Sequence, residues 1–147
     1  MNMLLLYIIN TCVVLLVVTV HYEFLYHATR LIPKLSMKPR FRIVFGVGMA
    51  LFAHTVEIWI FAIVYFLLIL DGRWGGMEGN FTGTLMDCVY FSFTTFSTLG
   101  FGDIHPVGDI RYITGISSLT GIVPRLLLTT PPALSSPWCE PPSGTWR

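Results

Sequence analysis

Two long apolar runs, at residues 3–20 and 43–70, constrain this chain more than any other feature. A helix that crosses the hydrocarbon core of a bilayer needs about 20 such residues. Only 12% of the side chains are charged, against roughly 25% in soluble domains, so a globule of this size would lack a polar surface. The sequence therefore predicts an all-α integral membrane protein. A formal net charge of +1 leaves no basic face for nucleic acid.

We expect residues 1–26 to form a first transmembrane helix that is retained in the mature protein. A cleaved signal peptide is the alternative, but it would begin with a basic segment, and no Lys or Arg precedes Arg30. Residues 43–70 are predicted to form the second, outer transmembrane helix. This run exceeds the minimal span, so the helix is expected to tilt or to overhang the membrane.

The charges between these runs predict the orientation of the chain. Residues 27–42 carry five basic side chains and no acidic one, which is typical of a cytoplasmic loop. Residues 71–83 carry Asp71 and Glu78 with a single basic residue, Arg73, and are predicted to form an external loop. We therefore expect a multi-pass protein of the cell membrane, whose next segment is entered from outside.

Residues 84–106 are predicted to form a hairpin that does not cross the membrane. The helix expected over "TLMDCVYFSFTTFS" (residues 84–97) is too short to span a bilayer. Thr84 and Asp87 have the spacing of a capping box at its start. Irregular backbone after it, at membrane depth, is stable only where it is buried in protein or lines a water-filled path. We therefore predict a re-entrant helix and loop, in the order span, span, pore loop, span.

The glycines of this loop suit a pore lined by successive carbonyl oxygens. Such a lining needs backbone angles of alternating hand, and Gly100 and Gly102 adopt positive φ without a Cβ penalty. The carbonyls of residues 98–101, with the Thr98 hydroxyl, would then replace the water around a cation. Asp103 would lie at the outer mouth, where it bonds back to the loop or concentrates cations. The alternative is a plain turn, which does not explain the preceding half-helix rich in Ser, Thr and aromatic residues.

The stretch "STLGFGD" (residues 97–103) resembles the potassium-channel signature T-x-G-[Y/F]-G-D. The surrounding "YFSFTTFSTLGFGDIHP" resembles the complete pore helix and filter of that family. The resemblance covers residues 44–123, the span–pore–span unit of the two-transmembrane ion-channel type found in small bacterial channels, and an extra span precedes it. It implies that K⁺ is the permeant ion. It assigns filter roles to Thr98, Leu99, Gly100, Phe101 and Gly102, and the role of outer-mouth acid to Asp103.

Two residues depart from the family pattern, because Leu99 replaces the commoner Val or Ile and Phe101 the commoner Tyr. Both departures change packing behind the filter rather than the ring of carbonyls. We expect both side chains to point away from the pore, against aromatic residues of the half-helix. One chain supplies one filter segment, so four chains are needed to close the ring. A homotetramer with cyclic symmetry in the lipid bilayer is therefore expected.

Ionisable residues lie within both spans. His54 and Glu57 are three positions apart near the centre of the second span and share one helical face. Glu23 and His27 are similarly placed towards the end of the first span, with His21 nearby. Ionisable groups at membrane depth are functional candidates. Three interpretations remain open for His54 and Glu57: an interhelical polar clasp, a pH sensor, and a metal or catalytic site.

Residues 109–130 are predicted to form a third, inner helix, with Asp109 as its N-cap and a kink or break at Pro124. Six of the nine prolines occur from Pro124 onward, so residues 131–147 are expected to be a disordered tail. The abrupt change in character suggests an altered reading frame or a natural truncation in this region.

The leading functional hypothesis is a K⁺-selective, or at least cation-selective, channel subunit. It would conduct passively, without enzymatic activity and without a cofactor other than the permeant ion. One alternative is a non-conducting or truncated relative with a broken inner helix. Another is a membrane metal-binding protein or enzyme that uses the intramembrane residues His21, Glu23, His27, His54 and Glu57.

Overall fold

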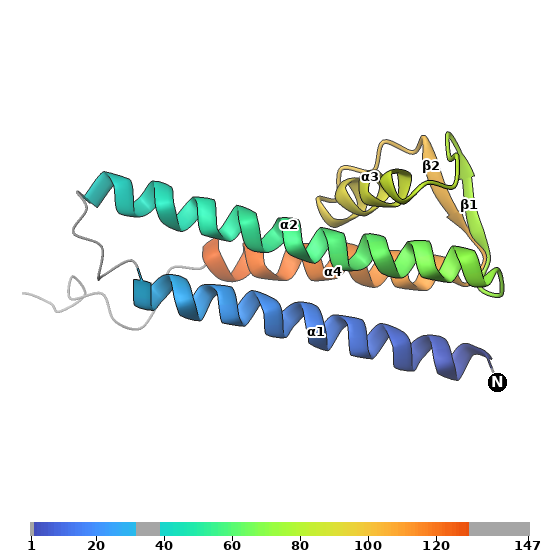
Figure 1. Cartoon of the computed structure of the whole chain (residues 1–147), viewed down its shortest axis with the longest axis horizontal. Coiled ribbons are helices and arrows are strands. Elements are labelled where there is room, and N and C mark those ends of the chain that lie inside the picture. Colours follow the sequence, from blue (N-terminus) through green and yellow to red (C-terminus); the bar gives the residue numbers. More distant parts are fainter. Residues whose placement is uncertain (1, 32–38, 130–147) are drawn as a thin grey trace, which may run out of the picture.

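The computed structural model describes residues 2–31 and 39–129 of the chain. Its elements are, in order, α1 (Asn2–Leu31), α2 (Pro39–Asp71), β1 (Gly76–Gly79), α3 (Leu85–Phe96), β2 (Ile104–Val107) and α4 (Ile110–Thr129). The long helices α1, α2 and α4 lie side by side, and the short helix α3 packs beside α2 near one end (Figure 1). A ribbon of β1 and β2 covers the same end.

Two of the described helices are long and apolar enough to cross a membrane, over residues 3–31 and 40–71. In the most apolar stretch of each helix, only 22% is buried inside the chain for residues 3–31 and 39% for residues 40–71. Most of their apolar surface therefore faces outward, as lipid-facing helices require. Helix α4, which is richer in Ser, Thr and Gly, does not reach the same hydropathy, so its crossing of the membrane stays a prediction.

The predicted bounds of the basic loop, residues 27–42, are wrong. Helix α1 continues to Leu31 and α2 begins at Pro39, so both ends of this segment are helical, and its middle lies outside the described residues. Arg30 lies in the last turn of α1, where a positive charge suits the helix dipole, and its guanidinium lies 4.4 Å from the centre of the Tyr26 ring. Long basic side chains let a helix continue past the apolar run, because their charged ends reach water.

The described residues are mostly helical, as the prediction of an all-α membrane protein requires, but part of the predicted external loop, residues 71–83, is a strand. β1 pairs antiparallel with β2, in a register that sets Gly76 opposite Val107. The chains approach too closely for a side chain at Gly75, where a Cβ would lie 2.0 Å from the Val107 carbonyl oxygen. The ribbon therefore ties the two ends of the segment between α2 and α4 together.

Helix α3 begins with the predicted capping box. Thr84 Oγ1 accepts the Asp87 backbone N–H at 3.2 Å, and Asp87 Oδ2 accepts the Thr84 N–H at 3.2 Å. The Thr82 hydroxyl and backbone N–H donate to the same carboxylate, and these bonds lower the pKa of Asp87 to about 2. The first turn of α3 therefore carries a negative charge at neutral pH, which suits a helix N-terminus.

The core lies where α2 faces α3 and α4. Phe61 and Tyr65 of α2 are fully buried, and the Tyr65 ring meets Phe91 edge-on with ring centres 5.2 Å apart. The hydroxyls of Tyr65 and Ser117 share a hydrogen bond of 2.8 Å between α2 and α4. The Ser92 hydroxyl of α3 donates to a backbone carbonyl of α2 at 2.8 Å. These bonds satisfy polar groups that burial would otherwise leave unpaired, and they fix how α3 and α4 lie against α2.

Helix α4 runs from Ile110 to Thr129, so a break at Pro124 is wrong, and the helix begins one residue later than predicted. A proline removes one backbone hydrogen bond, and a helix can bend around that loss without ending. Gly121 of α4 meets the end of α3, since a Cβ there would lie 2.1 Å from the Phe96 carbonyl oxygen. The predicted tail, residues 131–147, lies outside the described residues.

The contact at Gly121 predicts the effect of a single methyl group. Gly121→Ala places a Cβ against the Phe96 backbone, and we expect a loss of roughly 1–3 kcal/mol in stability. Gly115→Ala is the matched control on the same helix, because nothing lies within 4 Å of a Cβ there, and alanine should stabilise by up to about 1 kcal/mol. The measurement is the unfolding midpoint of the purified chain in detergent. Equal midpoints for the two variants would contradict the contact.

Candidate functional site

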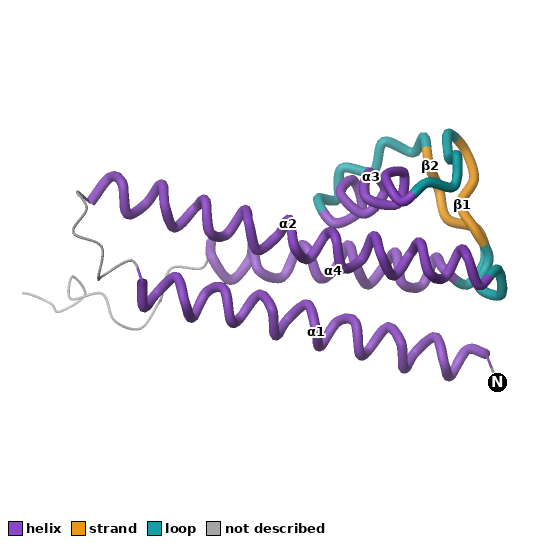
Figure 2. Tube along the Cα trace, viewed as in Figure 1, coloured by secondary structure: helices purple, strands orange, loops and turns teal. Residues whose placement is uncertain are grey.

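Residues 98–103 connect α3 to β2 as an irregular loop, which returns towards the end of the molecule from which α3 started (Figure 2). The angle φ is positive at Thr98 (61°), Gly100 (52°) and Gly102 (80°), whereas the residues between them keep negative φ. The alternation of hand expected at the two glycines is present. Its extension to Thr98 was missed, because a β-branched residue rarely adopts positive φ.

Backbone hydrogen bonds fasten this loop to the end of α3. The N–H groups of Leu99 and Gly100 both donate to the Thr94 carbonyl, at 2.9 and 3.1 Å. The Thr98 N–H donates to the Thr95 carbonyl at 2.9 Å. These carbonyls belong to the last turn of the helix, where no intrahelical partner is available. The shape of the loop is therefore set by how α3 ends.

Asp103 lies at the far end of the loop and is held by the half-helix. The Tyr90 hydroxyl donates to Asp103 Oδ2 at 2.9 Å, and this bond raises the pKa of Tyr90 above its ordinary value. The Tyr90 ring also stacks on Phe101, with ring centres 6.4 Å and planes 4° apart, which is the packing expected of Phe101. The packing expected of Leu99 is wrong within a single chain, because 57% of its surface is exposed.

The loop, α3 and α4 line an open hollow of about 340 Å³. The residues of the loop with positive φ form part of its wall, together with hydroxyl side chains from both helices. The lining residues are Phe91, Thr94, Thr95, Thr98, Gly100, Gly102, Ile104, Thr114 and Ser118. Three of the five predicted filter residues therefore face a space whose wall carries oxygen atoms. Oxygen is the ligand that replaces water around an alkali cation.

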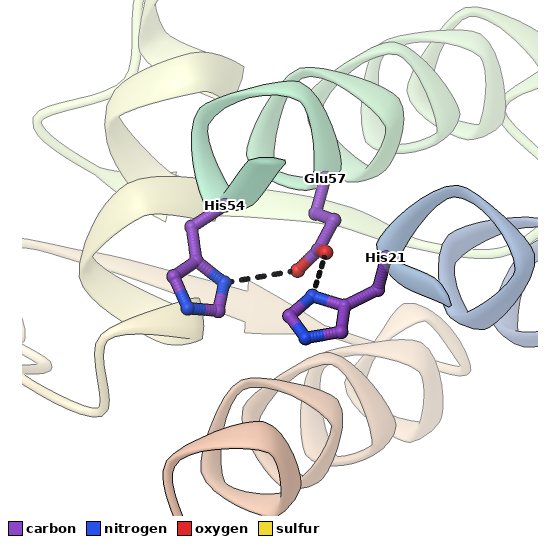
Figure 3. Close-up of side chains that lie close together, drawn as sticks. All are labelled: His21, His54 and Glu57. Atoms are coloured by element: carbon purple, nitrogen blue, oxygen red, sulfur yellow. Dashed lines mark hydrogen bonds and ion pairs between the residues drawn. The ribbon is translucent and has the colours of Figure 1, made fainter. Parts of the chain in front are cut away.

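Glu57 lies between two imidazole rings in the interior of the helical bundle (Figure 3). Its side chain is fully buried. Its Oε1 lies 2.6 Å from His21 Nδ1 of α1, and its Oε2 lies 3.2 Å from His54 Nδ1 of α2. The carboxylate thus joins α1 to α2, which is the geometry of an interhelical polar clasp.

His21 was expected near Glu23 and His27, but the structure places it beside Glu57. Glu23 and His27 do pair, at 3.5 Å, but they are 56% and 70% exposed. His21 instead follows the buried residues Val13 and Val17 at successive steps of four. That spacing marks one face of a helix, so it was the signal that placed His21 on the inward side of α1.

The helices and the hairpin define a helical membrane protein. Residues 43–130 match the family described as "Ion channel", of the two-transmembrane type. The chain belongs to this family, the potassium-channel pore family. The match covers α2, the hairpin and α4, close to the range 44–123 that the resemblance suggested, and α1 lies outside it.

One relative is the potassium channel protein kcv of Paramecium bursaria Chlorella virus 1, which is 41% identical over 54 residues. The aligned part is 32% of this chain and 57% of the relative, so the chain spans little more than half of that relative's length. No solved structure matches the chain. The family points to a channel rather than an enzyme, and the roles of individual filter residues stay predictions.

The bond between Tyr90 and Asp103 predicts how firmly the loop is held. Tyr90→Phe keeps the stack on Phe101 and removes the hydroxyl, so we expect faster amide hydrogen exchange across residues 98–103, where a local tie is lost. Tyr22→Phe, on an exposed position of α1, is the control and should leave exchange there unchanged. Exchange followed by mass spectrometry in detergent measures both. Identical protection of the loop in Tyr90→Phe and in the unsubstituted chain would contradict the tie.

Proposed function

We propose that this chain is a subunit of a potassium-selective channel, in which four copies arrange residues 98–102 around a common axis. The observation that carries the proposal is the alternating backbone at Thr98, Gly100 and Gly102, within a chain of the ion-channel family. An ion that enters such a path loses its water, and the carbonyl oxygens offset that loss. Transport is passive, and ions advance by repulsion between adjacent sites.

The surroundings of the loop support this role electrostatically. The C-terminal end of α3 carries the partial negative charge of the helix dipole, and its residues Thr94 and Thr95 line the hollow beside the loop. Thr114 and Ser118 of α4 add hydroxyl groups on the opposite wall. A cation that has left the filter would therefore meet negative potential and oxygen ligands. Asp103 adds a negative charge at the proposed outer mouth.

The exposed apolar surface of the hairpin supports assembly. Phe93 of α3 is 56% exposed, and Leu99 and Phe101 of the loop are 57% and 65% exposed. Large apolar side chains that are exposed on the hairpin indicate a surface that is covered in the assembled protein. A homotetramer with cyclic symmetry both covers this surface and closes the ring of carbonyls. Leu99 would then find in a neighbouring chain the packing that it lacks in its own.

We propose three membrane crossings, by α1, α2 and α4. The 20 residues of α4 give a length of about 30 Å at 1.5 Å per residue, which equals the hydrocarbon thickness. The five basic residues within residues 27–42 support a cytoplasmic location for the connection between α1 and α2, by the positive-inside rule. The hairpin and its ribbon then lie at the external side of the cell membrane.

Flux into liposomes tests the proposal. We expect the purified chain to pass K⁺ faster than Na⁺, and Gly100→Ala to abolish the K⁺ flux. Gly100 has a φ of +52°, and alanine in a left-handed conformation costs about 1–2 kcal/mol per residue, here repeated in each of four subunits. Gly115→Ala, in the helical part of α4 with open space around its Cβ, is the matched control and should keep the flux.

Three outcomes would contradict the proposal. Equal flux from Gly100→Ala and the unsubstituted chain would mean that the loop backbone does not line the path. A well-folded tetramer without K⁺ flux would instead favour the non-conducting relative. Cross-linking in mild detergent that stops at monomer or dimer would show that four chains do not form a closed ring of carbonyls.

A further inference from the structure

We propose that His21, His54 and Glu57 bind a divalent transition metal of the zinc class, which fastens α1 to the channel unit. One ligand atom from each residue lies within 4.8 Å of the other two. The three side chains come from two helices and converge on one point, with Glu57 between the rings (Figure 3). This binding site goes beyond the proposed ion conduction and does not depend on it.

The donor atoms suit a metal of this class. Zinc takes imidazole nitrogen and carboxylate oxygen at about 2.0–2.2 Å in tetrahedral geometry, which sets neighbouring ligands about 3.3 Å apart. The two carboxylate oxygens of Glu57 already lie 2.6 and 3.2 Å from the Nδ1 atoms of His21 and His54. A metal bound at the two Nδ1 atoms would take the place of the hydrogen-bonded protons, which would move to Nε2 of each neutral ring, and small side-chain movements would bring the ligands to bonding distance. The fourth position would hold water, as in other zinc sites with three protein ligands.

The charge of the cluster also favours a bound cation. The Glu57 side chain has no exposed surface, and the hydrogen-bond partners that the structure gives it are two imidazoles. A carboxylate between neutral imidazoles keeps a net negative charge, and such a charge is costly at membrane depth. A divalent metal would use the same three side chains as ligands and, with water in the fourth position, leave a net charge of +1, which the loss of one proton from that water cancels.

A metal at the position of this cluster would link α1 to the end of α3. The His54 ring lies 5.7 Å from the ring of Phe96, the last residue of α3, and 5.4 Å from the His21 ring. The backbone of Phe96 in turn contacts Gly121 of α4. The site therefore lies where α1 meets the elements that hold the filter loop. Because α1 is outside the family match, a metal here would tie α1 to the part of the chain that matches the ion-channel family.

Metal binding by the full chain tests this inference. After treatment with a chelator, the protein in detergent is dialysed against Zn²⁺ and its metal content is measured. We expect about one Zn²⁺ per chain, and an affinity at least about tenfold weaker in His21→Gln and in Glu57→Gln, since loss of even an outer-shell partner costs that much. His27→Gln is the matched control, because His27 lies on the same helix in an exposed pair with Glu23, and it should keep the metal.

A second measurement uses the unsubstituted chain, so it does not depend on the folding of a variant. Co²⁺ added to the chelator-treated protein should give the visible spectrum of a four-coordinate site with nitrogen and oxygen ligands, and Zn²⁺ should displace it. A chain that binds no Zn²⁺, or shows only the spectrum of hexahydrated Co²⁺, would overturn the site and leave the hydrogen-bonded clasp. Equal binding by His21→Gln would also overturn it. A chain that binds Zn²⁺ without conducting K⁺ would leave this inference standing and remove the proposed function.

Discussion

The structure depends on one constraint, which is that backbone polar groups inside a membrane must all have partners. Helices meet it by themselves, but the loop at residues 98–103 does not. The backbone N–H groups of Thr98, Leu99 and Gly100 donate hydrogen bonds to the last carbonyls of α3. The Asp103 carbonyl accepts the Asn80 N–H at 2.8 Å, and under the proposed function a desolvated cation is the partner of the carbonyls of residues 98–101. In this proposal, therefore, the carbonyls that make the loop costly to bury are also the groups that bind the ion.

The rest of the fold holds this loop in place. The ribbon of β1 and β2 ties its outer end, and the capping box at Thr84 sets where α3 begins. The contact of Gly121 with Phe96 sets where α3 ends against α4. Glu57 then joins α1 to α2 beside that point. The proposed metal would act on this junction, since its ligands lie next to the helix end from which the loop starts.

Much of the hairpin could be predicted from the sequence because its determinants are local. Thr84 and Asp87 are three residues apart, and the positive φ of Gly100 and Gly102 follows from glycine chemistry. The ribbon could not be predicted, because two four-residue strands acquire their pairing only when the hairpin brings them together. The spacing of Val13, Val17 and His21 indicates the inward side of α1, but the pairing of His21 with Glu57, 36 positions away on another helix, could not be predicted. Helix continuation through Pro124 could not be predicted, because an internal proline can either end a helix or only bend it.

The central claim is that carbonyl oxygens from four chains coordinate a cation. Anomalous X-ray scattering from crystals of the assembled protein, grown with Tl⁺ in place of K⁺, tests it most directly. We expect peaks along a fourfold axis, each surrounded by the carbonyl oxygens of residues 98–101 from four subunits. Hairpins that lie apart from any shared axis, or Tl⁺ bound elsewhere and absent from those carbonyls, would contradict the claim.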